Sequence, residues 1–131
     1  QLFGAAVRDI HDVFSPVGIT PVPMAPADVA GVLNLRGRII TMIDLCARLG
    51  MSKSAASKPM AIGVERQGEV YGLLVDKVGE VMRLDTDTFE NNPVNMDPRW
   101  ADVTRGVHRL DGRLLIILDI DRLLKVNAIA A

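Results

Sequence analysis

Residues 31–40 read GVLNLRGRII, and residues 106–115 read GVHRLDGRLL. The two stretches share glycine, valine, leucine and arginine positions at a constant offset, since 106 − 31 = 75 and 112 − 37 = 75. The match continues without a gap, so that Ile43-Asp44-Leu45 corresponds to Leu118-Asp119-Ile120. A gapless match through glycine, arginine and aspartate indicates an internal duplication, and this duplication decides the fold class.

A second correspondence lies upstream, where Phe3-Gly4 matches Tyr71-Gly72 at an offset of 71 − 3 = 68. A longer connection over residues 85–100 accounts for the difference of 75 − 68 = 7 residues between the two offsets. We therefore predict one domain over residues 1–131, made of two related lobes at about 1–50 and 60–131. Residues 51–59, rich in Ser, Ala and Lys, are predicted to connect the lobes, and strands could be exchanged between them.

Each lobe is predicted to consist mainly of strands. The apolar runs Ile39–Ile43 and Leu114–Leu118 have the length of buried strands, and Asp111-Gly112 is a hairpin signal. Short helices are expected to follow these strands, at Leu45–Leu49 and Ile120–Val126. Short strands with glycine turns and little helix are typical of small barrels, so the predicted class is all-β, with two β lobes.

Composition excludes several classes of function. The chain has 15 basic and 16 acidic residues without a basic cluster, and 4% aromatic residues, so nucleic-acid binding is not expected. Its one cysteine, Cys46, allows no internal disulfide and favours a reducing compartment. No apolar run approaches the ~20 residues that span a bilayer, so no membrane insertion is expected. Because the chain begins with Gln1 instead of Met, we expect it to be part of a longer protein.

Candidate catalytic residues are few. His11 and His108 have no metal-ligand spacing and do not correspond in the repeat. Asp44 and Asp119 do correspond, which could mean a carboxylate dyad. Each, however, stands between a predicted strand and a predicted helix, where a short carboxylate accepts hydrogen bonds from unpaired N–H groups. We therefore predict that both cap helices, and that the chain has no catalytic residue, metal or cofactor.

Val7, Ile10 and Val13 recur at every third residue, and Val75, Val78 and Val81 repeat the pattern. Such spacing could mark a helix face, but β-branched residues after a glycine fit a bent or bulged strand as well. The pattern allows two functions, core packing or an exposed apolar groove for a partner.

The motif Asn34-Leu35-Arg36-Gly37, followed by Ile39–Asp44, resembles the CheW family of bacterial chemotaxis. The segments 71–81 and 113–124 resemble two further marked regions of that family, so the resemblance covers almost the whole chain. It implies two SH3-like five-stranded β-barrels and an adaptor without catalytic activity. Such an adaptor lies in the cytoplasm at receptor arrays and links the chemoreceptor tip, a helical hairpin, to the regulatory domain of the kinase CheA.

The receptor tip would lie in an apolar groove between the lobes. The residues that we predict to bind partners are Val7, Ile10, Asp12, Val13, Gly31, Val32, Asn34, Arg36, Val78 and Val81. Among them, Arg36 matches the marked arginine of the family. It occupies a turn position where the second half has Asp111, and a turn does not require arginine there. We therefore expect the Arg36 charge to serve a contact.

The sequence departs from the family in two respects: residues 85–105 show no pattern that can be carried over, and family members begin with an extra strand before the position of Phe3. The repeat predicts the same gap, since Tyr71-Gly72 follows an apolar strand at 60–66 and a turn at 67–68, whereas only two residues precede Phe3. The first lobe is thus predicted to lack its first strand. The strand at Phe3–Val7 would then be an open edge or would pair with a foreign strand, which includes self-association.

Three alternatives remain open. The chain could be the regulatory domain of a CheA kinase or part of a CheV-type adaptor fused to a receiver domain. It could also be a small β-barrel enzyme or ligand carrier, which would require Asp44 and Asp119 to converge on one cleft.

Overall fold

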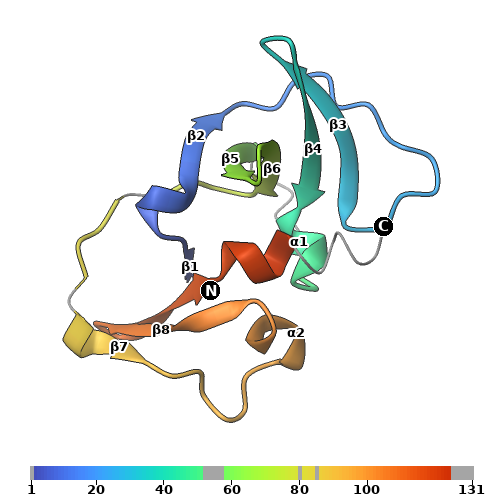
Figure 1. Ribbon diagram of the computed structural model, residues 1–131. Helices are drawn as coiled ribbons and strands as arrows, with labels where there is room; N and C mark the ends of the chain where they lie inside the picture. Colours follow the sequence, from blue (N-terminus) through green and yellow to red (C-terminus); the bar gives the residue numbers. More distant parts are fainter. Residues whose placement is uncertain (1, 52–57, 80, 85, 125–131) are drawn as a thin grey trace. The chain divides into compact units, whose positions relative to one another are not determined.

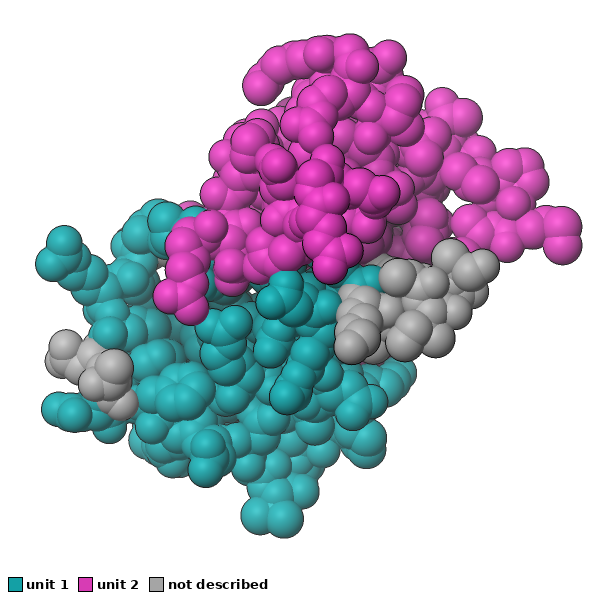
Figure 2. Space-filling model, viewed as in Figure 1, with its two compact units in different colours: residues 1–7, 80–130 teal, residues 8–79, 131 magenta. Residues whose placement is uncertain are grey.

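The computed structural model describes residues 2–51, 58–79, 81–84 and 86–124. The chain forms two compact units, shown in Figure 2. Unit 1 contains residues 1–7 and 80–130, and unit 2 contains residues 8–79. Both are built mainly from strands, as predicted (Figure 1).

Unit 2 holds a five-stranded sheet in the order β2-β5-β6-β4-β3. Its strands are β2 (Ile10–Phe14), β3 (Val29–Leu35), β4 (Arg38–Asp44), β5 (Met60–Arg66) and β6 (Glu69–Val75). All neighbouring strands are antiparallel except β4 and β6, which run parallel. Apolar side chains from β3, β4, β5 and β6 form one buried cluster, made of Leu33, Ile40, Met42, Ala61, Val70 and Leu74. This aliphatic cluster stabilises the unit, as the low aromatic content predicts.

Unit 1 holds a four-stranded sheet in the order β1-β9-β8-β7. Its strands are β1 (Leu2–Gly4), β7 (Phe89–Glu90), β8 (Thr104–Leu110) and β9 (Arg113–Leu118). A 3₁₀ turn, η2 (Thr86–Thr88), and a short helix, α2 (Pro98–Ala101), lie in the long connection before β8. Trp100 of α2 packs edge-on against Phe3 of β1, with 5.4 Å between ring centroids.

The structure confirms the duplication. The hairpins β3–β4 and β8–β9 each have a register shift, between Val29 and Gly31 and between Thr104 and Gly106, and these positions are 75 residues apart. The parallel pairs also correspond, because Tyr71 pairs with Thr41 in unit 2 and Phe3 pairs with Ile116 in unit 1. These pairs reproduce both sequence offsets, 71 − 3 = 68 and 116 − 41 = 75.

The capping prediction is also confirmed. The Asp44 carboxylate accepts a hydrogen bond of 3.2 Å from the amide of Ala47, at the start of α1 (Leu45–Arg48). The Asp119 carboxylate accepts one of 3.2 Å from the amide of Arg122, in the helix that begins at Ile120. The structure describes that helix to Leu124, so the predicted end at Val126 lies outside the described residues.

The units do not coincide with the predicted lobes at 1–50 and 60–131. The pairing of β6 with β4 places the β5–β6 hairpin in unit 2, while the pairing of β1 with β9 places the amino-terminal strand in unit 1. Strands are therefore exchanged between the two halves of the sequence. The predicted boundary assumed that neighbouring stretches of sequence share a lobe. Parallel strands such as β4 and β6 cannot be joined by a tight turn, so they pair although they are far apart in the sequence. Of the predicted connector, residues 52–57 lie outside the described part of the chain.

Strand β1 lies at the edge of its sheet, with β9 as its neighbour. In unit 2 its counterpart β6 lies between β4 and β5, and β5 in turn pairs with β2. Unit 1 contains no counterpart of β5 among the described strands. Residues 78–82 correspond to β2, since 10 + 68 = 78 and 14 + 68 = 82, and their described members form no strand. Among the described strands β1 is therefore an edge strand, as predicted. The predicted extent to Val7 is wrong, because β1 ends at Gly4 and Val7 begins the 3₁₀ turn η1 (Val7–Asp9).

Candidate protein-binding surface

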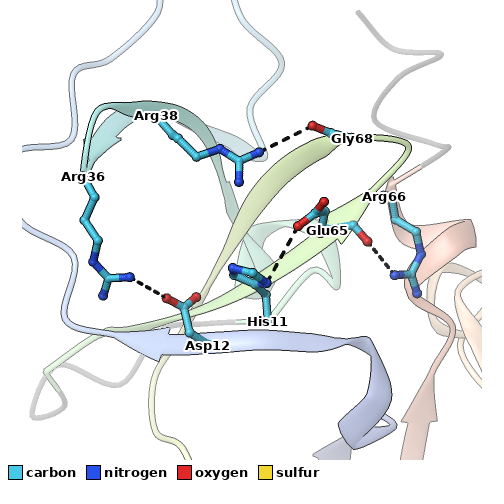
Figure 3. Close-up of polar contacts among 7 residues, drawn as sticks. All are labelled: His11, Asp12, Arg36, Arg38, Glu65, Arg66 and Gly68. Atoms are coloured by element: carbon cyan, nitrogen blue, oxygen red, sulfur yellow. Dashed lines mark hydrogen bonds and ion pairs between the residues drawn. The ribbon is translucent and has the colours of Figure 1, made fainter.

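A polar cluster covers part of unit 2, and Figure 3 shows its side chains. They come from β2, the β3–β4 turn, the start of β4, β5 and the β5–β6 turn. We define the cluster as His11, Asp12, Arg36, Arg38, Glu65, Arg66 and Gly68.

Arg36 occupies the β3–β4 turn in a left-handed backbone conformation. Its φ is 52° and that of Gly37 is 84°, and the side-chain oxygen of Asn34 accepts a hydrogen bond of 3.1 Å from the Gly37 amide. Asn34 therefore shapes the turn, which explains its position without a partner. A two-residue hairpin turn favours Asn, Asp or Gly at the position of Arg36. The arginine side chain is 78% exposed, so the turn displays a charge at some cost in backbone strain.

Asp12 on β2 faces Arg36, with 3.8 Å between Oδ2 and Nη1 (Figure 3). The register of β2 against β5 shifts between Ile10 and Asp12, and the Asp12 carboxylate lies over Gly63 of β5. A side chain larger than glycine at position 63 would collide with Asp12 Oδ1. This oxygen is buried and forms no hydrogen bond with the described chain. The close contact with Gly63 thus fixes the position of the Asp12 carboxylate, and its other oxygen, Oδ2, faces Arg36.

Further ion pairs flank this pair. His11 Nδ1 lies 3.8 Å from Glu65 Oε2, and Arg66 Nη2 donates a hydrogen bond of 2.8 Å to Asp9 Oδ1. Arg38 Nη2 lies 3.5 Å from the carbonyl oxygen of Gly68. Exposed ion pairs such as His11–Glu65 contribute only about 0–1 kcal/mol each, and only the Asp9–Arg66 pair is largely buried on both sides, so the cluster does little for stability outside that pair. It is better suited to presenting alternating charges to another molecule.

A shallow hollow of about 410 Å³ lies beside the cluster and is lined by Arg38, Ile39, Thr41, Gly68, Glu69 and Val70. Next to it, the Tyr71 hydroxyl donates a hydrogen bond of 2.8 Å to Glu69, and this bond raises the pKa of Tyr71 above its usual value. Ile39 is 67% exposed, so the prediction of a buried strand over Ile39–Ile43 is wrong at its first residue. Small-molecule sites are usually enclosed and mostly apolar, and this open hollow is not of that kind.

The predicted partner-binding residues have different environments. Four apolar ones are exposed: Val7, Val13, Val78 and Val81. Ile10, Asp12 and Val32 are half-buried, Asn34 and Arg36 are exposed, and Gly31 is buried. Val7 and Val81 belong to unit 1 and the other eight to unit 2. Within unit 2 the structure brings Asp12 and Arg36 together, and the predicted groove between the lobes stays a prediction.

Gly31 has a structural explanation. Its φ is 147°, and a side chain there would collide with the carbonyl oxygen of Thr20. Thr20 crosses this point because it exchanges two hydrogen bonds, of 2.8 and 2.9 Å, with Val32. Gly31 and Val32 therefore anchor the β2–β3 connection, whether or not they also contact a partner.

The sequence analysis missed several residues. It assigned no role to Asp9, Glu65 and Arg66, because the antiparallel pairing of β2 with β5, which places these charges near one another, leaves no clear pattern in the sequence. It also found no pattern in residues 85–105, where Glu90 of β7 pairs with Val107 as Thr20 pairs with Val32. The carbonyl oxygen of Glu90 lies over Gly106, together with the Phe89 ring, as the carbonyl oxygen of Thr20 lies over Gly31. The repeated glycines at 31 and 106 were the available signal.

The geometry gives no support to the alternative of an enzyme. Asp44 and Asp119 each serve a cap in a different unit, so the equivalent acids are accounted for by local structure. Across the described ranges, no three His, Cys, Asp or Glu residues are grouped so that they could hold a metal ion. None of the described helices has the length and apolar character needed to cross a membrane.

Two β units of related design, with a cluster of exposed charged side chains on unit 2, have the architecture of a protein-binding module. The model of the CheW-like domain family matches residues 1–128, and the chain belongs to this family. The predicted membership of the family is thereby confirmed.

Relatives and a solved structure agree. Chemotaxis protein CheW of Thermotoga maritima is 34% identical over 95% of this chain and 82% of its own length. Chemotaxis protein CheW of Rhizobium meliloti is 33% identical over 88% of this chain and 74% of its own. The crystal structure of the scaffolding protein TtCheW from Thermoanaerobacter tengcongensis matches 88% of this chain and 75% of its own, at 36% identity and a TM-score of 0.79. The predicted all-β fold with SH3-like lobes is confirmed by this match.

Proposed function

We propose that this chain is a scaffold that couples chemoreceptors to the histidine kinase CheA in bacterial chemotaxis and catalyses no reaction itself. Its place of action would be the cytoplasm, at receptor arrays. The names of its relatives, chemotaxis proteins and a scaffolding protein, support this role. A scaffold needs only binding surfaces, and it transmits a signal if it binds two states of a partner with different affinity.

The observation that carries the proposal is the Arg36 turn. Arg36 stands where the equivalent hairpin of unit 1 has Asp111. Its backbone is left-handed and its side chain is 78% exposed, so the arginine adds little to stability. Arginine is enriched among the residues that dominate protein interfaces, because its guanidinium donates several hydrogen bonds in fixed directions. Asp12 holds this guanidinium in one region of the surface, 3.8 Å away, until a partner's acceptor competes for it.

The partners follow from the family resemblance. The receptor tip is the expected ligand of the surface that includes Arg36 and Val13, which lie on the β3–β4 turn and on β2. The regulatory domain of CheA is the expected second partner. Because Arg36 and Asp12 lie in unit 2 and need no rearrangement to be reached, we expect binding to change side-chain positions more than the backbone.

Replacing Arg36 tests this proposal. We expect Arg36→Ala to weaken binding of a receptor-tip fragment about tenfold, since a central interface arginine contributes more than ~1 kcal/mol. The melting temperature should stay within about 2 °C, because the lost ion pair is exposed and contributes less than ~1 kcal/mol. Titration calorimetry and thermal denaturation measure the two effects.

Arg113→Ala is the matched control, since Arg113 is an exposed arginine beside the equivalent turn of unit 1. It should bind like the unmodified chain. The double variant Asp12→Arg/Arg36→Asp keeps an ion pair but exchanges the positions of its two charges. We expect it to bind the receptor-tip fragment as weakly as Arg36→Ala does. Unchanged binding of Arg36→Ala, together with a large loss of thermal stability, would assign Arg36 a structural role and reject the proposed surface.

A further inference from the structure

The parallel pair of strands β4 and β6 is open at one end. Its first pair is Thr41 with Tyr71, which lies 41 − 38 = 3 residues after β4 begins and 71 − 69 = 2 residues after β6 begins. Residues 38–40 and 69–70 are therefore not paired with each other, and we call these two segments the β4–β6 fork. The shallow hollow of about 410 Å³ lies at this fork, because residues of both segments line it.

Both strands of the fork turn backbone groups into it. β3 and β4 are joined by a two-residue turn, so the residues that flank the turn form a hydrogen-bonded pair and the next pair, Asn34 with Ile39, does not. The N–H and C=O of Ile39 therefore point away from β3 and into the fork. The same alternation follows the β5–β6 turn, where Glu65 with Val70 is the corresponding pair, so the N–H of Val70 also points into the fork. Backbone groups that lack a neighbouring strand can pair with an added one.

The side chains at the fork add an apolar contact and a positive charge on the β4 side. Ile39 is exposed, and the Arg38 guanidinium reaches across the fork, where Nη2 lies 3.5 Å from the carbonyl oxygen of Gly68 (Figure 3). This contact is at the limit of a hydrogen bond, and Arg38 forms no ion pair with the described residues. The negative charge of the fork, Glu69, lies on the β6 side and accepts the hydrogen bond of the Tyr71 hydroxyl.

We propose that the β4–β6 fork binds an extended segment of a partner protein, in which an acidic residue stands next to an apolar one. The backbone of the segment pairs with Ile39, as in other cases of strand addition. Its carboxylate replaces the Gly68 carbonyl as the partner of Arg38 and accepts two hydrogen bonds from the guanidinium. Neighbouring residues of a strand point to opposite faces, so Arg38 and Ile39 select an acidic residue and its apolar neighbour.

The backbone groups of the fork decide between kinds of ligand. A helix uses its N–H and C=O groups internally, so it cannot pair with Ile39, whereas an extended segment can. A nucleic acid or an anionic membrane would need several positive charges, and the lining of the fork has one arginine and one glutamate. The proposal goes beyond the scaffold function proposed above and does not rest on it.

The test titrates the full chain with a blocked pentapeptide of sequence Thr-Val-Asp-Val-Thr, followed by the amide signals of the protein in NMR spectra. We expect the Ile39 and Val70 signals to shift, with a Kd of about 1 mM or tighter. Arg38→Ala should weaken binding about tenfold, because it removes a charge-assisted contact. Arg113→Ala is the matched control and should bind equally, since 113 − 38 = 75 makes Arg113 the counterpart of Arg38 beside the separate hollow of unit 1.

Two modified peptides separate the parts of the proposal. A peptide with Lys in place of Asp tests the charge, and a peptide that is N-methylated at its backbone amides tests strand addition. Each should bind about tenfold more weakly than the first peptide, because the first loses the contact with Arg38 and the second cannot donate backbone hydrogen bonds. The spectrum of Arg38→Ala without peptide shows whether that variant is folded.

Equal binding of the N-methylated peptide would overturn strand addition, and equal binding of the Lys peptide would overturn the assigned charge. Shifts confined to the Arg113 hollow, or the same shifts produced by acetate with the same affinity, would overturn the fork as a peptide site. No shift at about 10 mM peptide would also overturn the inference. In each case the proposed function would stand, because it is tested through the receptor-tip fragment and Arg36→Ala.

Discussion

Gly31→Ala is expected to lower the free energy of unfolding by about 3 kcal/mol or more, and the melting temperature by about 10 °C. Two costs add at this position. A methyl group would collide with the carbonyl oxygen of Thr20, which is backbone and cannot rotate away, and the φ of 147° strains any side chain. Relief would require breaking the Thr20–Val32 hydrogen bonds and releasing the β2–β3 connection. Thermal and urea denaturation measure the loss.

Gly37→Ala is the matched control for this prediction. Gly37 also has a positive φ, of 84°, but a methyl group there would meet no atom within 4 Å. It therefore incurs the backbone strain alone, about 1 kcal/mol. If the two variants lost equal stability, the close approach of Thr20 would not be what Gly31 serves.

Completing the open edge of unit 1 should have the opposite effect. In unit 2, residues 60–66 form β5, pair with β6 along its whole length and join it through the turn at Gln67-Gly68. A copy of residues 60–68 fused directly before Gln1 would place the same strand and turn against β1, since 69 − 68 = 1. Each cross-strand pair contributes roughly 0.2–1 kcal/mol, so we expect a gain of about 2 kcal/mol. Hydrogen exchange should show new protection at Phe3 and in residues 78–82, the counterpart of β2.

The control is the same fusion carrying Ile62→Pro in the copied strand, because proline removes a ladder hydrogen bond and disfavours pairing. It should be no more stable than the unmodified chain. If both fusions gave the same melting temperature as the unmodified chain, β1 would not pair with an added strand. The correspondence between β1 and β6 would then be limited to their parallel pairing with β9 and β4. Sedimentation of the unmodified chain would show whether a second copy already fills this edge.

The duplication made much of the fold predictable. A gapless repeat of Gly, Arg and Asp fixes where hairpins turn and where helices start, because these residues have narrow backbone requirements. The paired caps at Asp44 and Asp119 and the open edge at Phe3 followed from it. The boundaries of the units could not be predicted in this way. They depend on the parallel pairing of β6 with β4, which are far apart in the sequence, and local sequence patterns do not show which distant strands pair.

The candidate site was only partly predictable. Arg36 stood out because the second half has Asp111 at the same turn, and Asp12 was included as a member of the repeated segment, where it matches Glu80. Their mutual approach depends on the bulge in β2 and on Gly63 beneath Asp12, which no local pattern revealed. Ile39 was assigned to a buried strand because a short apolar run cannot distinguish a fully buried strand from one with an exposed end.

The central claim is that this chain physically couples a receptor to a kinase. Its most direct test is co-sedimentation of purified CheA with membranes that contain the cognate chemoreceptor, with and without this chain. We predict that CheA sediments with the membranes only when the chain is present, and that Arg36→Ala reduces the sedimented fraction while Arg113→Ala does not. CheA recovered equally with and without the chain, under conditions where the folded chain is in excess, would contradict the account.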